Sequence, residues 1–390
     1  MYIKRIYEDA VLASLRNFPV TALTGPRQCG KSTLAKHLIA QYGNSIYLDL
    51  ERPSDLAKLE NAEWFLSSRK DSLICIDEVQ RSPGLFPLIR SLTDEWDKPA
   101  AFLLLGSASR ELMQQSSESL AGRINYIRIA PFVWSELRGR AETAFETYLN
   151  RGGFPRSLLA AADDVSYEWR QSFIAAFLER DLREWAGFAP LTMRRLWQML
   201  AHNNGQTVNY SALASSLGVS AVSVKNYIDL LASVFMLDVI PPWVNNLGKR
   251  LVKAPKIYLP DTGLLTALLG LRSFEEAMGH PGFGALWEQT VLTNLRTYFP
   301  AAEIFHYRTS GGAECDFVIK LHGRLFAAEC KASPAPKLSK GNYSAFADIS
   351  PVHTFVVTPA GSGWPMAPGI DAVTLGEIRV KISNFLEFPL

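Results

Sequence analysis

The residues with the clearest chemical potential form a glycine-rich segment near the amino terminus. Gly25, Gly30, Lys31 and Ser32 have the spacing G-x-x-x-x-G-K-[ST], between an apolar run and a helical stretch. Glycines at both ends let successive backbone N–H groups point at phosphate oxygens. We predict that Lys31 neutralises the β- and γ-phosphates of ATP and that Ser32 coordinates Mg²⁺; the alternative is a glycine-rich turn. The predicted phosphate-binding residues are Gly25, Pro26, Arg27, Gln28, Cys29, Gly30, Lys31, Ser32 and Thr33.

Two adjacent carboxylates, Asp77 and Glu78, end the apolar run 73–76. Asp77 is predicted to hold the water shell of Mg²⁺, and Glu78 to orient and polarise the attacking water. Taken alone, the pair would be an ordinary polar start of a loop. Because it follows the glycine-rich segment in an alternating α/β pattern, it favours ATP hydrolysis as well as ATP binding.

Two further residues of the amino-terminal third each have a functional and a structural interpretation. Ser107 follows the apolar run 103–105 and could sense the γ-phosphate, or it could cap a helix. Arg123 precedes a strand that starts at Ile124, and it could act in trans on the γ-phosphate of a neighbouring subunit. That role predicts a homo-oligomer, whereas the alternative is a surface ion pair.

A second group of charged residues lies in the last third of the chain. A two-residue hairpin turn at 322–323 would place Asp316 directly opposite Glu329. Like charges in that position repel unless a cation lies between them, so the pair predicts a Mg²⁺ or Mn²⁺ site. Lys331 would orient a water or offset charge at a phosphodiester. The alternative is a set of cross-strand ion pairs, such as Glu314 with Lys331, on a solvated face.

The elements that must position these residues fall into three segments. Up to about residue 140, short apolar runs alternate with helical patterns and predict a mostly parallel sheet with crossover helices. The next segment is helical and contains a helix-turn-helix pattern over 210–217 and 221–234, then two short strands around the basic loop 245–253. From about residue 260, an amphipathic helix over 283–299 precedes several strands.

The helix-turn-helix with its two strands has the element order of a winged helix, which suggests DNA as a partner. The start of its second helix supplies a single cation, Lys225, and the basic loop adds Lys249, Arg250 and Lys253. Winged helices also serve as packing or oligomerisation modules, so both interpretations stay open.

Composition limits the possible functions. Forty Lys and Arg against 38 Asp and Glu give the 390-residue chain a formal charge of +2, which excludes a broad electrostatic attraction to nucleic acid. No apolar run is long enough to span a membrane, and the first residues do not form a signal peptide. Four cysteines without metal-ligand spacing fit a reducing compartment, so we expect a cytoplasmic protein.

Several short motifs spread over nearly the whole chain: 25–32, 76–81, 105–107, 120–123, 151–155, 178–182, 253–258 and 261–264. Together they resemble a bacterial and archaeal family of AAA-type ATPases with a C-terminal DUF4143 domain. The resemblance implies an α/β P-loop ATPase domain (1–140), a helical and winged-helix domain (141–255) and a domain like the PD-(D/E)XK nucleases (256–390). Glu288 would then be the acidic helix residue of the nuclease metal site. Arg156 departs from the family, where an acidic residue is more usual.

These observations lead to two functional hypotheses. The first is an oligomeric, DNA-directed ATPase that hydrolyses ATP with Mg²⁺ and whose C-terminal site is a metal-dependent nuclease or a relic that binds DNA structures. The alternative is an ATP-dependent signalling switch that acts on a protein partner and has no nuclease activity.

Overall fold

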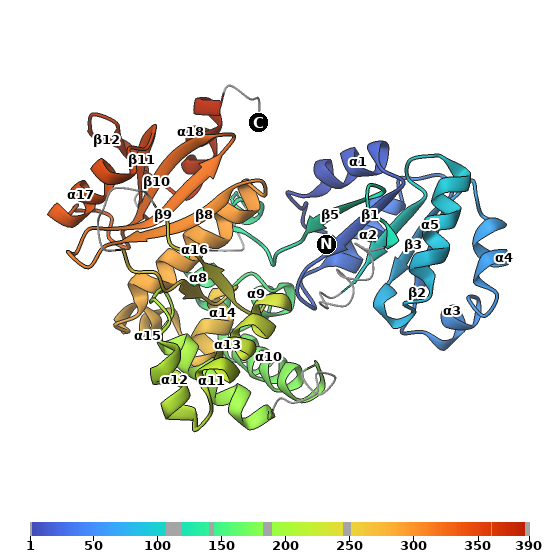
Figure 1. Ribbon diagram of the computed structural model, residues 1–390, viewed down its shortest axis with the longest axis horizontal. Coiled ribbons are helices and arrows are strands. Elements are labelled where there is room, and N and C mark those ends of the chain that lie inside the picture. The colour runs from blue at the N-terminus through green and yellow to red at the C-terminus, as the bar shows by residue number, and fades with distance from the viewer. Residues whose placement is uncertain are drawn as a thin grey trace. The chain divides into compact units, whose positions relative to one another are not determined.

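The computed structural model describes residues 2–106, 119–139, 144–181, 189–244, 251–359 and 361–386 (Figure 1). The chain forms two compact units. The first comprises Met1–Phe132 and Ser233–Met236, and the second comprises Val133–Ala232 and Leu237–Leu390. Within the described residues, no helix combines the length and the apolar character needed to cross a membrane.

The first unit is built on a five-stranded sheet in the order β2-β3-β4-β1-β5. Every pairing in it is parallel, as the alternating pattern predicts. Because β4 lies between β1 and β3, the carboxyl ends of these three strands share one edge of the sheet, where ligands bind in open α/β folds. The strands are β1 (Val20–Thr24), β2 (Ser45–Asp49), β3 (Leu73–Asp77), β4 (Phe102–Leu105) and β5 (Ile124–Arg128).

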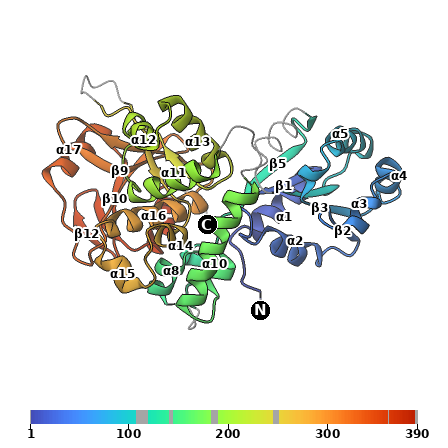
Figure 2. The same cartoon turned by 90° about the horizontal axis from the view of Figure 1, so that it is seen from below.

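Helices cover both faces of this sheet, which explains why every residue of β1, β3 and β4 is buried. Helices α1 and α2 contact one face, and α5 packs on the other through Phe86, Ile89 and Trp96 (Figure 2). The helices are α1 (Glu8–Asn17), α2 (Lys31–Ile39), α3 (Pro53–Ala57), α4 (Ala62–Ser67) and α5 (Leu85–Trp96), with a 3₁₀ helix at Val79–Arg81.

The second unit begins with a helical segment. Its helix-turn-helix elements lie where the sequence predicts them, with Gly218 at φ 68° ending the first helix. A short antiparallel pair follows, β6 (Asp238–Ile240) with β7 (Lys256–Tyr258). The helices of this segment are α7 (Trp134–Leu137), α8 (Phe145–Arg151), α9 (Pro155–Leu158), α10 (Asp163–Ala176), a π-helix (Phe177–Asp181), α11 (Pro190–His202), α12 (Tyr210–Leu217), α13 (Ala221–Ser233), α14 (Thr262–Leu268) and α15 (Phe274–Gly279).

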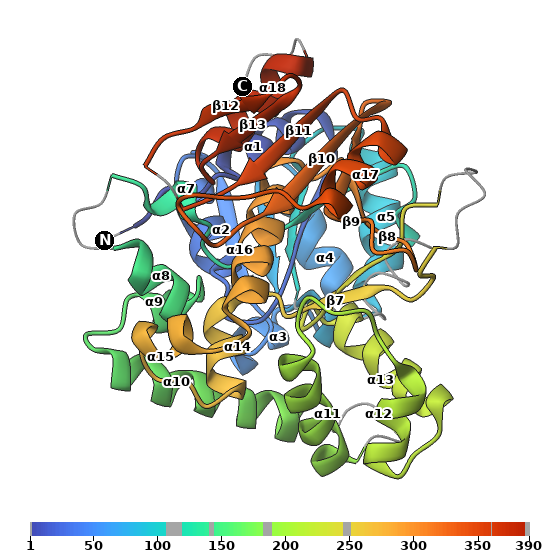
Figure 3. The same cartoon turned by 90° about the vertical axis from the view of Figure 1, so that its left-hand side faces the viewer.

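A six-stranded mixed sheet completes the second unit, in the order β12-β13-β11-β10-β9-β8 (Figure 3). The hairpin of β9 and β10 has the predicted register, from Leu321 opposite Arg324 to Phe317 opposite Ala328. Its turn residues, 322 and 323, both have positive φ, as a tight hairpin turn requires. The elements are α16 (Phe283–Tyr298), β8 (Glu303–Arg308), β9 (Glu314–Leu321), β10 (Arg324–Cys330), α17 (Lys340–Ile349), β11 (His353–Val357), β12 (Trp364–Ala367), β13 (Ile370–Val373) and α18 (Glu377–Leu386).

Two of the family motifs meet inside the second unit, at the glycine turn after α8 and the start of α14. The buried Asp261 carboxylate accepts hydrogen bonds from Gly153 N at 2.6 Å and from Leu264 N at 3.0 Å, so it caps α14 and holds the turn. A Cβ on Gly152 would lie 2.2 Å from Asp261 Oδ1, and one on Gly263 would lie 2.1 Å from a carbonyl of the turn. These glycines are therefore required by close packing.

A fully buried arginine, Arg170 of α10, joins the same contact. Its Nη1 donates to Asn150 O at 2.8 Å, Gly263 O at 3.1 Å and Thr266 Oγ1 at 2.6 Å. Burial lowers the pKa of Arg170 to about 10, and the charge of Asp261 acts against that decrease. The guanidinium thus stays ionised at neutral pH and ties α8, α10 and α14 together.

We expect Gly152→Ala to lower the free energy of unfolding by about 2–3 kcal/mol, because its methyl group would displace the capping carboxylate. Gly270→Ala is the matched control: Gly270 has a similar φ, 77° against 72°, but no atom lies within 4 Å of an added Cβ. Its cost should be the backbone strain alone, about 1 kcal/mol. Urea unfolding followed by tryptophan fluorescence would compare the two, and equal losses would contradict the close-packing explanation.

Candidate functional site

The glycine-rich segment forms a curled loop between β1 and α2. Gly25 has φ 143° and Gly30 has φ 102°, backbone conformations that residues other than glycine rarely adopt. A Cβ on Gly25 would lie 2.1 Å from Ile129 O, so this glycine is also fixed by the chain after β5. Lys31, the first residue of α2, is buried and its Nζ donates to Gly25 O at 2.9 Å and Pro26 O at 2.8 Å. The lysine ammonium therefore lies over the loop that should carry the phosphates.

The carboxylate Asp77 ends β3 and is 5% exposed. It accepts hydrogen bonds from the Tyr47 hydroxyl and from Glu78 N, the latter at 3.0 Å. Burial, and then the hydrogen bond to Asp77, raise the pKa of Tyr47 above its usual range, while the Ser32 side chain interacts with the same hydroxyl and lowers it. One phenol therefore lies between the two predicted Mg²⁺ ligands, Ser32 and Asp77.

Sequence reasoning missed Tyr47, although the sheet register contains a signal for it. Asp49 of β2 pairs with Asp77 of β3, and Tyr47 precedes Asp49 by two residues. Residues two apart on a strand share a face, so Tyr47 lies on the same face as the carboxylate. Recognising this requires knowing that β2 is the neighbour of β3.

The second predicted catalytic carboxylate, Glu78, has left-handed backbone angles of φ 55° and ψ 42°. Such a conformation is uncommon for a residue with a Cβ and often occurs at functional sites. Its carboxylate accepts a hydrogen bond from Gln80 Nε2. Burial raises the pKa of Glu78, while the Gln80 hydrogen bond and the charge of Lys31 lower it.

The glycine-rich loop is also hydrogen-bonded to Arg5, a residue that the sequence analysis did not single out. Arg5 is 3% exposed and donates to Cys29 O at 3.0 Å and to Ala130 O at 2.7 Å. Its guanidinium also lies 4.7 Å from the centre of the Phe132 ring. The segment before α1 is therefore part of the phosphate-loop structure.

Of the two residues predicted to act near the γ-phosphate, the structure describes Arg123 but not Ser107. Arg123 forms an exposed, two-contact ion pair with Asp94 of α5, with Nη2 2.9 Å from Oδ2. Since Val20 pairs with Ile124 in parallel strands, Arg123 lies at the amino end of the sheet and its own phosphate loop at the carboxyl end. It therefore forms the surface pair in this structure, and its predicted action in trans stays a prediction. Ser107 lies outside the described residues, after the end of β4.

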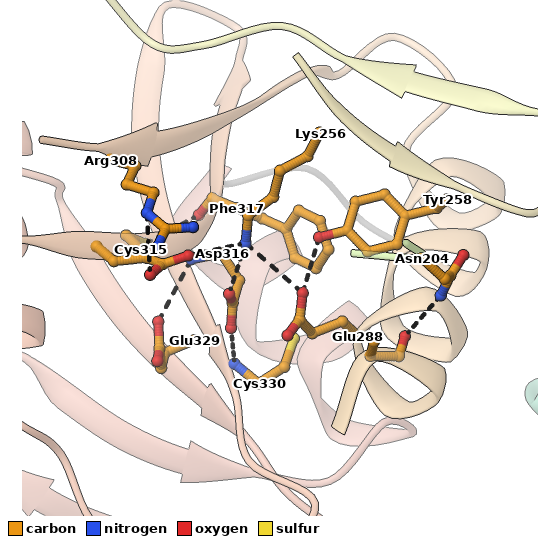
Figure 4. Close-up of polar contacts among 12 residues, drawn as sticks. Asn204, Lys256, Tyr258, Glu288, Arg308, Cys315, Asp316, Phe317, Glu329 and Cys330 are labelled. Atoms are coloured by element: carbon orange, nitrogen blue, oxygen red, sulfur yellow. Dashed lines mark hydrogen bonds and ion pairs between the residues drawn. The ribbon is translucent and has the colours of Figure 1, made fainter. Parts of the chain in front are cut away.

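Acidic residues of α16 and the C-terminal sheet come together as a carboxylate cluster, defined as Glu288, Glu314, Asp316 and Glu329. Figure 4 shows three of them, Glu288, Asp316 and Glu329. The buried ammonium of Lys256, on β7, lies among them, 3.2 Å from Asp316 Oδ1 and 3.1 Å from Glu314 Oε1. Within the described residues, no set of three or more His, Cys, Asp or Glu side chains is arranged to hold a metal ion. The structure thus brings the predicted residues near one another, and the metal site that they were predicted to form stays a prediction.

Lys331 contacts Glu329, with Nζ 2.8 Å from Oε1, and Glu314 instead contacts Arg308 and Lys256. Burial and neighbouring carboxylates raise the pKa of Glu288 to about 7 and that of Glu329 to about 8.

Comparisons with known proteins agree with this architecture. Residues 17–138 match the AAA domain family, residues 142–275 match a domain of unknown function (DUF8612), and residues 283–378 match another (DUF4143). Uncharacterized proteins of Mycobacterium tuberculosis and Mycobacterium bovis are each 37% identical to the chain over 366 residues, which is 94% of this chain and 82% of theirs. The chain belongs to the AAA-type P-loop ATPases that carry a C-terminal DUF4143 domain.

This membership confirms the family predicted from the motifs, and it makes the protein an ATP-binding ATPase. A solved structure described as a Walker-type ATPase of Pyrococcus abyssi has a TM-score of 0.50, with 15% identity over 69% of this chain and 96% of that chain. At that identity the similarity shows a shared fold. The glycine-rich loop described above, at the carboxyl edge of the parallel sheet, stays the predicted nucleotide site of the AAA/DUF4143 ATPase.

We expect Arg5→Met to lower the free energy of unfolding of the first unit by about 2–3 kcal/mol, because two carbonyls would lose a charged donor. ATP binding should weaken as well, since one of those carbonyls belongs to the phosphate loop. Lys4→Met, at the exposed neighbouring position, should change stability by less than about 0.5 kcal/mol. Urea unfolding with and without MgATP would test both variants, and similar effects from the two would contradict the role of Arg5.

Proposed function

We propose that this AAA/DUF4143 ATPase is an oligomeric, DNA-directed enzyme that hydrolyses ATP with Lys31, Ser32, Asp77 and Glu78. The arrangement of Lys31, Tyr47 and Asp77 supports the hydrolytic part of this proposal, because the Lys31 ammonium lies on the glycine-rich loop and the Tyr47 hydroxyl holds the predicted Mg²⁺ ligand Asp77 at the end of β3. The functional division into an ATPase domain (1–140), a helical and winged-helix domain (141–255) and a nuclease-like domain (256–390) belongs to the same proposal.

The residues at the phosphate loop fit a magnesium–nucleotide substrate. The Ser32 hydroxyl and the Asp77 carboxylate are the hard oxygen ligands that Mg²⁺ prefers. Bound Mg²⁺ would offset the negative charge of the β- and γ-phosphates. The backbone N–H groups of residues 25–33 would bind the phosphate oxygens, and Lys31 would exchange its contacts with loop carbonyls for contacts with phosphate.

Glu78 is proposed to orient the attacking water and accept its proton. Glu78 directly follows Asp77 and is partly buried, and its carboxylate is held in place by the hydrogen bond from Gln80. Ser107, which lies outside the described residues and follows β4 in the sequence, would sense the γ-phosphate. Arg123 would act on a neighbouring subunit, after release from Asp94, because it lies at the far end of its own sheet.

The DNA-directed part of the proposal rests on the helix-turn-helix formed by α12 and α13 and on the strand pair β6 and β7. On α13, Lys225 is exposed, and Lys253 is exposed in the segment that leads to β7. Lys249 and Arg250 lie outside the described residues. Such an arrangement would place α13 in a DNA groove with the basic segment on the phosphate backbone.

A second candidate, an ATP-dependent switch that acts on a protein partner, is supported by the surface of α13. Val222 at the start of this helix is 69% exposed, and the adjacent exposed positions supply one cation. An apolar, weakly charged helix start suits a protein surface better than a phosphate backbone.

We expect Glu78→Gln to lower ATP hydrolysis by about 10²- to 10⁴-fold while ATP binding is retained, because the amide cannot accept the proton of the water. Glu95→Gln, which removes an exposed carboxylate from α5, should leave turnover unchanged. Hydrolysis should be measured without DNA and with single-stranded, duplex and branched DNA. Stimulation by one form would support DNA as the partner, whereas a flat response that still depends on Glu78 would favour the protein-directed switch.

Removal of the Tyr47 hydroxyl tests the magnesium site. With Tyr47→Phe, Asp77 loses the donor that orients it, so the Mg²⁺ concentration for half-maximal hydrolysis should rise about tenfold. Turnover at saturating Mg²⁺ should change much less. Tyr42→Phe, on the turn after α2, is the control, and an unchanged Mg²⁺ requirement in Tyr47→Phe would remove Tyr47 from the site.

A further inference from the structure

Lys256 is the central residue of the carboxylate cluster in the C-terminal part of the chain. Its side chain is 2% exposed, and its Nζ lies 3.1 Å from Glu314 Oε1, 3.2 Å from Asp316 Oδ1 and 3.7 Å from Glu288 Oε2 (Figure 4). A lysine ammonium has three donors, and here it faces three carboxylates. On the same strand, the Tyr258 hydroxyl donates to Glu288 Oε2 at 2.8 Å.

We propose that the Lys256 ammonium takes the place that a divalent cation would hold in this nuclease-like cluster. The cluster would then be an internal ion network that fastens β7 to the C-terminal sheet, and it would neither bind a metal nor cleave a phosphodiester. This proposal is independent of the residue roles proposed for the ATPase site.

The first argument is one of charge and space. Carboxylates buried close together need a cation, and the ammonium supplies it without leaving the protein. A Mg²⁺ ion would need carboxylate oxygens at about 2.0–2.1 Å. The Lys256 ammonium already lies 3.1 Å from Glu314 Oε1 and 3.2 Å from Asp316 Oδ1. A divalent ion bound between these two carboxylates would therefore lie next to the ammonium and be strongly repelled by it.

The second argument is that protein donors already satisfy the other carboxylate oxygens. Asp316 Oδ2 accepts from Cys330 N at 2.9 Å. Glu329 Oε1 accepts from Lys331 Nζ and from Asn342 Nδ2, each at 2.8 Å, and its Oε2 accepts from Asp316 N at 3.3 Å. A metal ion would have to replace these bonds as well as the ammonium.

The third argument concerns access. Asp316 is 6% exposed and Glu329 is 4% exposed. The described ends of the chain between β6 and β7 are hydrogen-bonded along β8, through His306 N to Pro241 O at 3.0 Å and Val252 N to Arg308 O at 3.0 Å. This segment therefore covers the edge strand of the sheet, and the buried carboxylates expose little surface to a DNA strand.

The test exploits the difference between removing the charge and removing the volume of Lys256. Lys256→Ala removes both, so the cluster should gain a site for Mn²⁺. Lys256→Met keeps most of the volume and should gain none. All variants would carry Asp77→Ala, which removes the proposed cation ligand at the phosphate loop, and would be stripped with EDTA before titration with Mn²⁺ followed by electron paramagnetic resonance.

We expect no Mn²⁺ at the cluster with Lys256 present, and one ion in Lys256→Ala that is lost again in Lys256→Ala/Asp316→Ala. In EDTA, Lys256→Ala should melt about 5–10 °C lower, because the carboxylates lose their cation, and Mn²⁺ should restore most of that loss. Failure of Mn²⁺ to bind or to stabilise a folded Lys256→Ala protein would overturn the substitution of lysine for metal.

A measurement with Lys256 in place keeps the proposal testable should Lys256→Ala not fold. Mn²⁺ stoichiometry would be compared between Asp77→Ala and Asp77→Ala/Glu329→Gln. Equal stoichiometry, with no Mn²⁺-dependent cleavage of DNA by the full chain, is the expected result. Loss of one bound ion with Glu329→Gln, or cleavage that Asp316→Ala abolishes, would overturn the proposal.

Discussion

A charged or strongly polar group buried in a protein must find a partner, and this constraint shapes both units of the chain. In the first unit, Lys31 lies on loop carbonyls and Asp77 accepts from Tyr47. In the second, Arg170 donates to one carbonyl of α8 and one at the start of α14, and Lys256 lies among carboxylates of α16 and β9. The contacts of Lys31 are local, but the other three pairings join segments that are far apart in the sequence, so satisfying those charges also fixes how the elements pack.

The two groups of charges differ in what can reach them. The phosphate loop lies at the carboxyl edge of a parallel sheet, where the lysine can exchange carbonyl contacts for phosphate contacts. The carboxylate cluster has its cation built in on β7 and its edge strand covered. One arrangement suits an exchangeable ligand, and the other suits a permanent connection between β7 and the sheet.

The family motifs are also of two kinds, those that form the phosphate loop and those that join two segments of the chain. The glycines of the phosphate loop permit a curled backbone around a ligand, whereas Gly152 and Gly263 permit two segments of the chain to touch. Asp261 belongs to the second kind, since its carboxylate caps a helix and holds the glycine turn. A motif shared within a family is therefore not by itself evidence of a catalytic residue.

The sequence by itself determined the features that depend on local order. The phosphate loop follows from glycine spacing between a strand and a helix, and the register of β9 and β10 follows from a two-residue turn and the alternation of side chains. Only the tertiary structure decided the partners of these residues. Tyr47 reaches Asp77 because β2 neighbours β3, Arg5 reaches Cys29 through the packing of the segment before α1, and Lys256 enters the cluster from a strand outside the C-terminal sheet. Spacing along the chain carries no information about such contacts, because they arise only when distant segments pack and their buried charges must pair.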